Sequence, residues 1–142
     1  MNKYVDTVLK TVFDNAKDRN LFFSCFDPDV CTLLRLKQHR YPVLFLSCCI
    51  NDIYTKYKDI RSRSVAFGTS FVLSEGITGL GLFSTPLLKD PWKVEKARNA
   101  GIQAMFMWGD ENNEAKARER LKEMGVDGIL CDRLVMQCFS PV

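Results

Sequence analysis

The sequence predicts an α/β protein with a parallel sheet, because short apolar runs alternate with longer segments of helical periodicity along the chain. The clearest unit covers residues 102–133. Ala104 to Trp108 is an apolar run of strand length, Ala115 through Met124 has the spacing of a surface helix, and Val126 to Cys131 is a second apolar run. Two strands joined through a helix cannot pair as a hairpin, so we expect them to be parallel strands of a βαβ unit.

The sequence pattern of the first part of the chain predicts two helices and two strands. Apolar residues recur at intervals of three, four and seven from Tyr4 to Ala16, which is typical of an amphipathic helix. Leu21 to Cys25 is the first apolar strand. Asp27-Pro28 then predicts a helix start, with an acidic N-cap and proline at the first helical position, and this helix runs to about Lys37. Val43 to Ser47 is the second strand.

The middle of the chain begins with a polar stretch, Asn51 to Arg63, that has no clear period. Such long loops in compact domains are often functional. Ser64 is then a candidate cap for a helix through Leu73, which Glu75-Gly76 closes. The third strand, Ile77 to Phe83, contains two glycines, which indicates close backbone packing or a bend.

The remaining elements follow the same pattern. Asp90-Pro91 predicts another helix start and Gly101 its end, before the fourth strand at 104–108. Asn112 or Asn113 is a candidate cap for the helix that Gly125 terminates. The fifth strand follows, and residues 135–142 have no usable pattern and are expected to form an unstructured tail.

Two architectures fit five parallel strands separated by helices. One is a free-standing, doubly wound sheet, which suits a chain of 142 residues. The other is part of a (β/α)₈ barrel, which normally needs about 250 residues. The pattern of apolar runs by itself favours the first.

Composition excludes several classes of protein. The net charge of +3 is small, and the basic residues are interleaved with acidic ones, so we expect no nucleic-acid partner. No apolar run approaches the ~18 residues of a membrane span, and the start, MNKYVDTVLK, lacks the apolar core of a secretion signal. The cysteines show no CxxC spacing and are expected to be free thiols in the cytoplasm: Cys25, Cys31, Cys48, Cys49, Cys131 and Cys138.

Five segments, in order, carry a resemblance to a known family. They are YVDTVLKTVFDNA (4–16), FFSCFDPDVCTLLRLKQHRYPVLFLS (22–47), KDIRSRS (58–64), MFMWGDENN (105–113) and GVDGILCDR (125–133). Together they resemble the eukaryotic glycerophosphocholine phosphodiesterase branch of the glycerophosphodiester phosphodiesterases. The resemblance covers about residues 3 to 134.

The resemblance implies a partial TIM (β/α)₈ barrel, with residues 1–134 as the C-terminal portion of the domain. It also implies a hydrolase of lipid metabolism that cleaves glycerophosphocholine into glycerol phosphate and choline with a divalent metal, Mg²⁺ or Ca²⁺. The family's His-Arg-Gly, Glu-x-Asp and His-Asp motifs are absent, and the only histidine is His39. We therefore expect no catalytic residue, no metal ligand and no activity from this chain alone.

Two alternatives remain open at this point. The chain is either a non-catalytic binding or interaction relative of the family, or a flavodoxin-like module that resembles it by chance. For a barrel portion, the open sheet edges predict self-association or pairing with a complementary piece.

Candidate site residues lie where the predicted strands end, since active sites of barrels form at the carboxyl ends of the strands. Trp108 matches the tryptophan of the family's strand-end motif, so the resemblance implies a place for it in the substrate pocket, stacked on glycerol or facing choline. Asp132 is a weaker candidate for a polar group of the substrate. The other charged residues are expected to be caps, loop acids or solvated cations: Asp27, Asp90, Asp110, Glu111, Glu114, Arg35, Lys37, Arg61 and Arg63.

Overall fold

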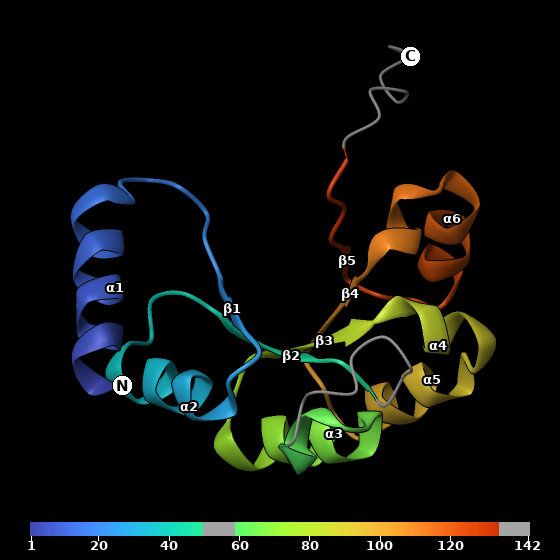
Figure 1. Cartoon of the computed structure of the whole chain (residues 1–142), viewed down its shortest axis with the longest axis horizontal. Helices are drawn as coiled ribbons and strands as arrows, with labels where there is room; N and C mark the ends of the chain where they lie inside the picture. Colours follow the sequence, from blue (N-terminus) through green and yellow to red (C-terminus); the bar gives the residue numbers. More distant parts are fainter. Residues whose placement is uncertain (50–58, 134–142) are drawn as a thin grey trace.

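The computed structural model describes residues 1–49 and 59–133, and within them the strands form one parallel sheet. The strands lie in sequence order (Figure 1), with bounds β1 Phe23–Cys25, β2 Val43–Ser47, β3 Gly79–Phe83, β4 Ala104–Trp108 and β5 Gly128–Ile129. A flavodoxin-like sheet reverses direction at a switch point, whereas successive strands of a barrel are neighbours. The doubly wound alternative is therefore wrong, and the fold is that of a partial (β/α)₈ barrel.

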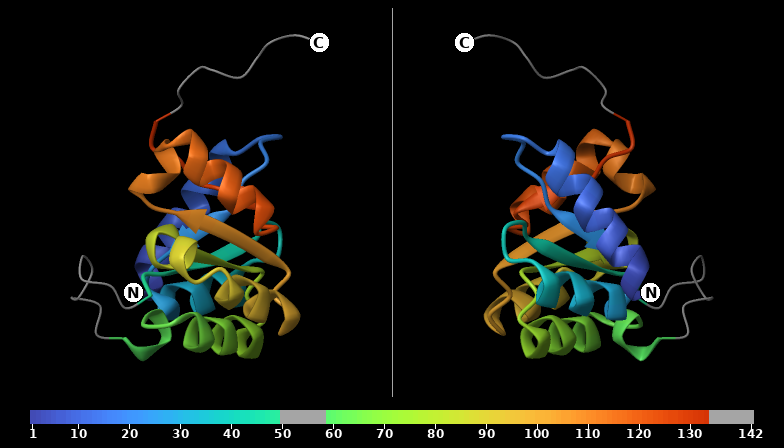
Figure 2. Two further views of the ribbon diagram at one scale, coloured as in Figure 1. Left: turned by 90° about the vertical axis from the view of Figure 1, so that its right-hand side faces the viewer. Right: turned by 90° about the vertical axis from the view of Figure 1, so that its left-hand side faces the viewer.

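The helices form an arc along one side of this sheet (Figure 1). The side views in Figure 2 show α2 and α3 on that same side. The helical segments are α1 Asn2–Asn15, α2 Pro28–Lys37, α3 Val65–Glu75, α4 Ser84–Lys89, α5 Trp92–Asn99 and α6 Ala115–Glu123, with short 3₁₀ turns η1 Ile60–Ser62 and η2 Asp110–Asn113. Of the predicted loop over 51–63, residues 51–58 lie outside the described residues, and the rest contains the turn η1. The predicted tail over 135–142 also lies outside them.

The core lies between the sheet and the helices. Side chains alternate along each strand, so Phe45, Leu80 and Met105, which are aligned across β2, β3 and β4, point to the same face. All three are completely buried in one cluster with helix residues such as Val72 and Leu121. Burial of this apolar surface is the main stabilising term, and it fixes which face of the sheet the helices cover.

The opposite face of the sheet carries Leu44, Leu46 and Phe106, which alternate with the core residues. Leu44 and Leu46 lie across β3 at its two glycines. A Cβ atom on Gly79 would come 2.5 Å from Leu44 Cδ2, and a Cβ atom on Gly81 would meet Leu46 Cδ2. The predicted close packing at the glycines of the third strand is confirmed. In a closed barrel this face is the interior.

Several predicted helix ends are confirmed in atomic detail. The Asp27 carboxylate accepts hydrogen bonds from the backbone amides of Asp29 (2.9 Å) and Val30 (3.1 Å) at the start of α2. Ser64 Oγ caps α3 through the amide of Phe67 at 3.1 Å. Gly76 ends α3 in the left-handed region, with φ of 63°.

Other predictions about elements are wrong. The sequence pattern does not predict helix α4, and its presence changes the role of Asp90, which ends α4 instead of capping α5. The Asp90 carboxylate makes an ion pair with Lys93 at 2.6 Å. The strands β1, β3 and β5 are also shorter than the apolar runs that contain them. A residue belongs to a strand only where it pairs with a neighbouring strand, and each apolar run continues beyond its paired residues into a loop.

Candidate functional site

The carboxyl ends of the five strands lie at one edge of the sheet, and the aromatic residues there form a cluster around Trp108. Trp108 is the last residue of β4 and is aligned with Phe83 at the end of β3. The Phe83 ring centroid is 4.7 Å from that of Trp108, and the Phe26 ring, which follows β1, meets the indole edge-on at 5.0 Å. We call Phe26, Phe83 and Trp108 the aromatic cluster. Aromatic pairs of this geometry each contribute about 0.5–1.5 kcal/mol, so the indole is held in one orientation.

The indole lies on the face of the sheet opposite the helix-covered core. Trp108 alternates with Met107, which is completely buried in the core, and shares its face with Phe106. Phe106 in turn contacts Phe22 at 5.5 Å between ring centroids. This face is the interior of a barrel, and its carboxyl-end edge is where barrel enzymes bind substrates.

The backbone after Trp108 requires glycine. Gly109 has a φ of 137°, a conformation that L side chains rarely adopt. A Cβ atom there would lie 2.8 Å from Phe83 Cε2 and 2.9 Å from Ser84 Oγ. Ser84, which is completely buried, donates a hydrogen bond from its hydroxyl to the Trp108 carbonyl at 3.2 Å. The chain therefore turns close against the end of β3, and this turn fixes the Trp108 backbone from which the indole extends.

Asn112 joins the ends of β4 and β5 from within η2. Its completely buried side-chain amide donates from Nδ2 to the carbonyls of Met107 and Leu130, each at 2.9 Å. The prediction that Asn112 or Asn113 caps α6 is wrong, because Glu114 occupies the N-cap position and no side chain caps the helix. Sequence reasoning missed this role, since one of the two acceptors lies 18 residues further along the chain.

Asp132 follows β5, which pairs with β4, the strand that ends in Trp108. It is exposed to solvent. The neighbouring Arg133 amide donates to Asn113 Oδ1 at 2.9 Å, which fixes the backbone at this point. Asp132 is thus at the predicted edge of the sheet, but the described contacts leave its carboxylate in solvent.

The only histidine lies at the other end of the molecule. His39 follows α2 and precedes β2, so it belongs to the edge where the strands begin. It is exposed, and its Nδ1 is 2.8 Å from Arg35 Nη1. His39 is therefore a surface residue, as expected, and is not near the aromatic cluster.

The acidic residues of the described ranges do not fit a divalent metal. In residues 1–49 and 59–133, no group of three or more His, Cys, Asp or Glu side chains could hold an ion. The Asp27 carboxylate is committed to its helix cap, and Asp110, Glu111 and Glu114 belong to the turn and N-cap before α6. No chemistry through a metal can be derived from these side chains.

The segment before α3 is held by a charge network rather than left free for phosphate. Arg61 makes ion pairs with Asp59 at 2.6 Å and with Asp29 at 2.8 Å. The hydrogen bond from Arg61 is the main cause that holds the pKa of Asp59 below its usual value. Two other basic residues are also engaged, since Arg35 donates to the Gly76 carbonyl at 2.8 Å and Lys37 pairs with Asp6 at 2.6 Å.

The five described cysteines are free thiols. Cys25, half-buried at the end of β1, has the most distinctive environment. Its Sγ accepts from the Asp27 amide at 3.4 Å. The side-chain hydrogen bond with Cys31 is the largest cause that lowers the pKa of Cys25 to about 6, against the opposing effect of burial. The same interaction, with burial, raises the pKa of Cys31.

Across the described ranges, none of the helices has the length and apolar character needed to cross a membrane.

Comparison with known proteins gives one consistent family. The model of the glycerophosphoryl diester phosphodiesterase family matches residues 1–136. A glycerophosphocholine phosphodiesterase of Rattus norvegicus is 42% identical over 134 residues, covering 94% of this chain and 20% of the relative. The corresponding enzyme of Homo sapiens is 40% identical, with the same coverage. The chain therefore spans about a fifth of the length of these relatives.

Solved structures show the same fold. A glycerophosphodiester phosphodiesterase from Parabacteroides distasonis superposes with a TM-score of 0.66 and 18% sequence identity, covering 92% of this chain and 47% of that one. The similarity in sequence to the eukaryotic glycerophosphocholine branch is confirmed by the relatives, and the partial barrel by the structure.

Proposed function

Because the chain belongs to the glycerophosphoryl diester phosphodiesterase family, we propose that it forms the substrate-facing, C-terminal portion of a glycerophosphocholine phosphodiesterase barrel. The complete enzyme hydrolyses glycerophosphocholine to glycerol phosphate and choline. In this proposal residues 1–134 contribute one side of the pocket. The remaining strands contribute the acid, the base and the ligands of a divalent metal, Mg²⁺ or Ca²⁺.

The aromatic cluster is the observation that carries this proposal. It lies at the carboxyl ends of the strands, and Trp108 is on the face that a closed barrel turns inward. An indole is the best aromatic partner for a quaternary ammonium ion, because its electron-rich face attracts the cation. We therefore assign Trp108 to the choline end of the substrate and Asp132, one strand along, to a hydroxyl of the glycerol end.

The proposal also holds that this chain is inactive by itself. Phosphodiester hydrolysis needs a base, an acid for the leaving alcohol and stabilisation of the developing charge. The sequence contains one histidine, His39, which lies at the opposite edge of the sheet from Trp108. Among residues 1–49 and 59–133, β1 and β5 each have a single neighbour, which supports the assignment of a barrel portion whose outer strands pair with further strands. The free thiols support a reducing, cytoplasmic compartment.

Choline release tests the proposal in two steps. The chain alone, with glycerophosphocholine and either Mg²⁺ or Ca²⁺, is expected to release no choline, and release would overturn the claim that the reacting groups lie elsewhere. In a chimera, the residues of this chain replace the matching segment of the Rattus norvegicus relative, which is 42% identical. A folded chimera is expected to release choline, and an inactive folded chimera would contradict the role of this chain in the pocket.

The role of Trp108 is tested in the active chimera. Trp108→Ala is expected to raise KM about thirtyfold, because a desolvated cation–π contact is worth ~2 kcal/mol. Trp108→Phe keeps an aromatic face and is expected to recover part of the loss. Trp92→Ala, which changes an exposed tryptophan on α5, is the matched control and is expected to leave KM unchanged. Equal KM values for Trp108→Ala and the unsubstituted chimera would remove Trp108 from the pocket.

A binding module without catalysis is the second candidate, favoured by the position of His39. It differs in one outcome: the chimera would bind glycerophosphocholine and release no choline. Binding is then detected as a shift of the Trp108 indole signal on titration with the diester.

A further inference from the structure

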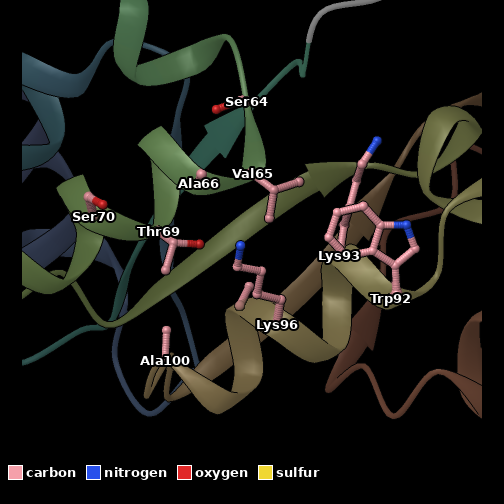
Figure 3. Close-up of a pocket in the computed structure, with 10 residues that line it drawn as sticks. Ser64, Val65, Ala66, Thr69, Ser70, Trp92, Lys93, Lys96 and Ala100 are labelled. Atoms are coloured by element: carbon pink, nitrogen blue, oxygen red, sulfur yellow. The ribbon is translucent and has the colours of Figure 1, made fainter.

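A groove lies between α3 and α5 (Figure 3), and its lining contains no residue of the aromatic cluster. It has a volume of about 320 Å³. Its apolar lining comes from Val65 and Ala66 of α3, from Ala97 of α5 and from Ala100, which follows α5. Small side chains at these positions leave room between the two helices for the body of an organic molecule.

The groove contains a hydroxyl group that the described part of the fold leaves unsatisfied. The Thr69 side chain belongs to α3 and is 7% exposed. Its Oγ1 is buried and has no hydrogen-bond partner among the described residues. Threonine within a helix commonly donates to the carbonyl four residues earlier, so an unpaired buried hydroxyl is unusual. Figure 3 shows this hydroxyl directed into the groove, toward the ammonium group of Lys96.

The charge at the groove is positive. The described residues provide no ion-pair partner for Lys96, which lies on α5 and lines the groove. Lys93 also lines it, but its ammonium is paired with Asp90 at 2.6 Å. Lys96 therefore supplies one uncompensated positive charge, next to one unused hydroxyl and an apolar floor.

Trp92 adds an aromatic side to this arrangement. It is the first residue of α5, and 57% of its surface is exposed. Figure 3 shows the indole at the end of the groove beyond Val65. The exposed indole therefore offers an apolar surface at this end of the groove, which the body of a ligand can cover.

We propose that the groove between α3 and α5 binds a small monocarboxylate with an aromatic or aliphatic body. The carboxylate lies between Lys96 Nζ and Thr69 Oγ1, and the apolar body covers the alanine floor and packs against Trp92. One positive charge and one hydroxyl donor match the charge and the two oxygens of a carboxylate. A phosphate dianion needs more donors than these two groups supply. The site is independent of the proposed function, since it uses none of the residues of the aromatic cluster.

Titration with 4-phenylbutyrate, followed by ¹H–¹⁵N NMR, tests the site. The protein has two tryptophans, so its two indole signals report the groove through Trp92 and the aromatic cluster through Trp108. The Trp92 signal is expected to shift to saturation while the Trp108 signal stays in place. Two control probes are 4-phenyl-1-butanol, which lacks the charge, and inorganic phosphate, which lacks the body, and both are expected to bind at least about tenfold more weakly. Absence of a saturating shift, or equal binding of the alcohol, overturns the proposal.

Substitutions then identify the two polar groups. Lys96→Gln is expected to weaken binding about tenfold, because it removes the charge that the carboxylate pairs with. Thr69→Val removes the hydroxyl at nearly constant volume and is expected to weaken binding severalfold, whereas Thr69→Ser keeps the hydroxyl and the affinity. Lys122→Gln, on the exposed surface of α6, is the matched control for loss of a positive charge. Binding that is unchanged in Lys96→Gln contradicts the proposal even if Thr69→Val fails to fold.

Discussion

Gly109 is the residue on which the position of Trp108 depends most directly. Its φ of 137° brings backbone strain to any other residue, and a Cβ atom there would overlap the Phe83 ring at 2.8 Å. Because these two penalties add, Gly109→Ala is expected to lower the free energy of unfolding by about 2–4 kcal/mol. Urea denaturation followed by circular dichroism measures this change.

Gly125 provides the control for that measurement. It also has a positive φ, of 72°, but a Cβ atom there would meet nothing within 4 Å. Gly125→Ala therefore tests the backbone penalty alone and is expected to cost about 1 kcal/mol. Equal losses in the two variants would show that the packing of Gly109 against the end of β3 has no energetic role.

Cys25 gives a prediction about pH. Its lowered pKa of about 6 means that the thiol is protonated and slow to react below pH 6, and is a reactive thiolate above it. Alkylation of Cys25 by iodoacetamide, measured by mass spectrometry, is expected to rise through pH 6 and to level off near neutral pH. Cys48, whose pKa is raised to about 11 mainly by burial, is expected to react little over the same range.

Removal of the neighbouring thiol tests the cause of this shift. Because the hydrogen bond with Cys31 is the main contribution to the lowered pKa, Cys31→Ala is expected to move the midpoint for Cys25 upward toward its ordinary value. A midpoint that stays near 6 in Cys31→Ala would assign the shift to the backbone amides instead.

The elements show how far local sequence signals reach. Asp27-Pro28 and Asp90-Pro91 are the same dipeptide, and each predicts the start of a helix with an aspartate cap. The first does begin one, but Asp90 is taken by the end of α4 and by the ion pair with Lys93. A cap is predictable when its partners lie within about four residues. The outcome changes when a neighbouring element uses the same residue.

The candidate site, too, could be predicted from the sequence only in part. The place of Trp108 at a strand end could be predicted, because the apolar run and the following glycine are local signals. Its contacts with Phe26 and Phe83 could not, since they join residues far apart in the sequence through the barrel-like order of the strands. The family resemblance implies that order, which the pattern of apolar runs alone does not favour.

Asn112 gives a prediction at the level of whole strands. Its amide holds the carbonyls of Met107 and Leu130, beside the backbone hydrogen bond from the Leu130 amide to the Met107 carbonyl at 2.8 Å. Asn112→Ala leaves both carbonyls with one partner fewer and is expected to cost about 2–3 kcal/mol. Hydrogen exchange should show the loss locally, with faster exchange at the Leu130 amide. Asn99→Ala, at the exposed end of α5, is the control that should leave exchange at β5 unchanged.

For the molecule as a whole, the outer strands of the sheet determine whether copies of the isolated chain associate. Within the described part of the chain, β1 and β5 each pair on one side only, and the face opposite the core carries Phe22, which is 44% exposed. Unpaired strand edges beside an exposed apolar surface promote association between copies. We therefore expect the isolated chain to form dimers or larger species, measured by size-exclusion chromatography with light scattering.

A charge placed on the edge separates edge pairing from other causes of association. Ser24 lies in β1 with an exposed side chain, so Ser24→Lys introduces a lysine where a second copy would pair. Natural proteins use lysine at sheet edges to prevent such contacts, and the variant is expected to shift the population toward monomer. Asn99→Lys adds the same charge on α5, away from both edges, and should leave the distribution unchanged. A parent chain that elutes as a stable monomer at every concentration would contradict this prediction. It would show that the open edges and the uncovered face do not drive association between copies.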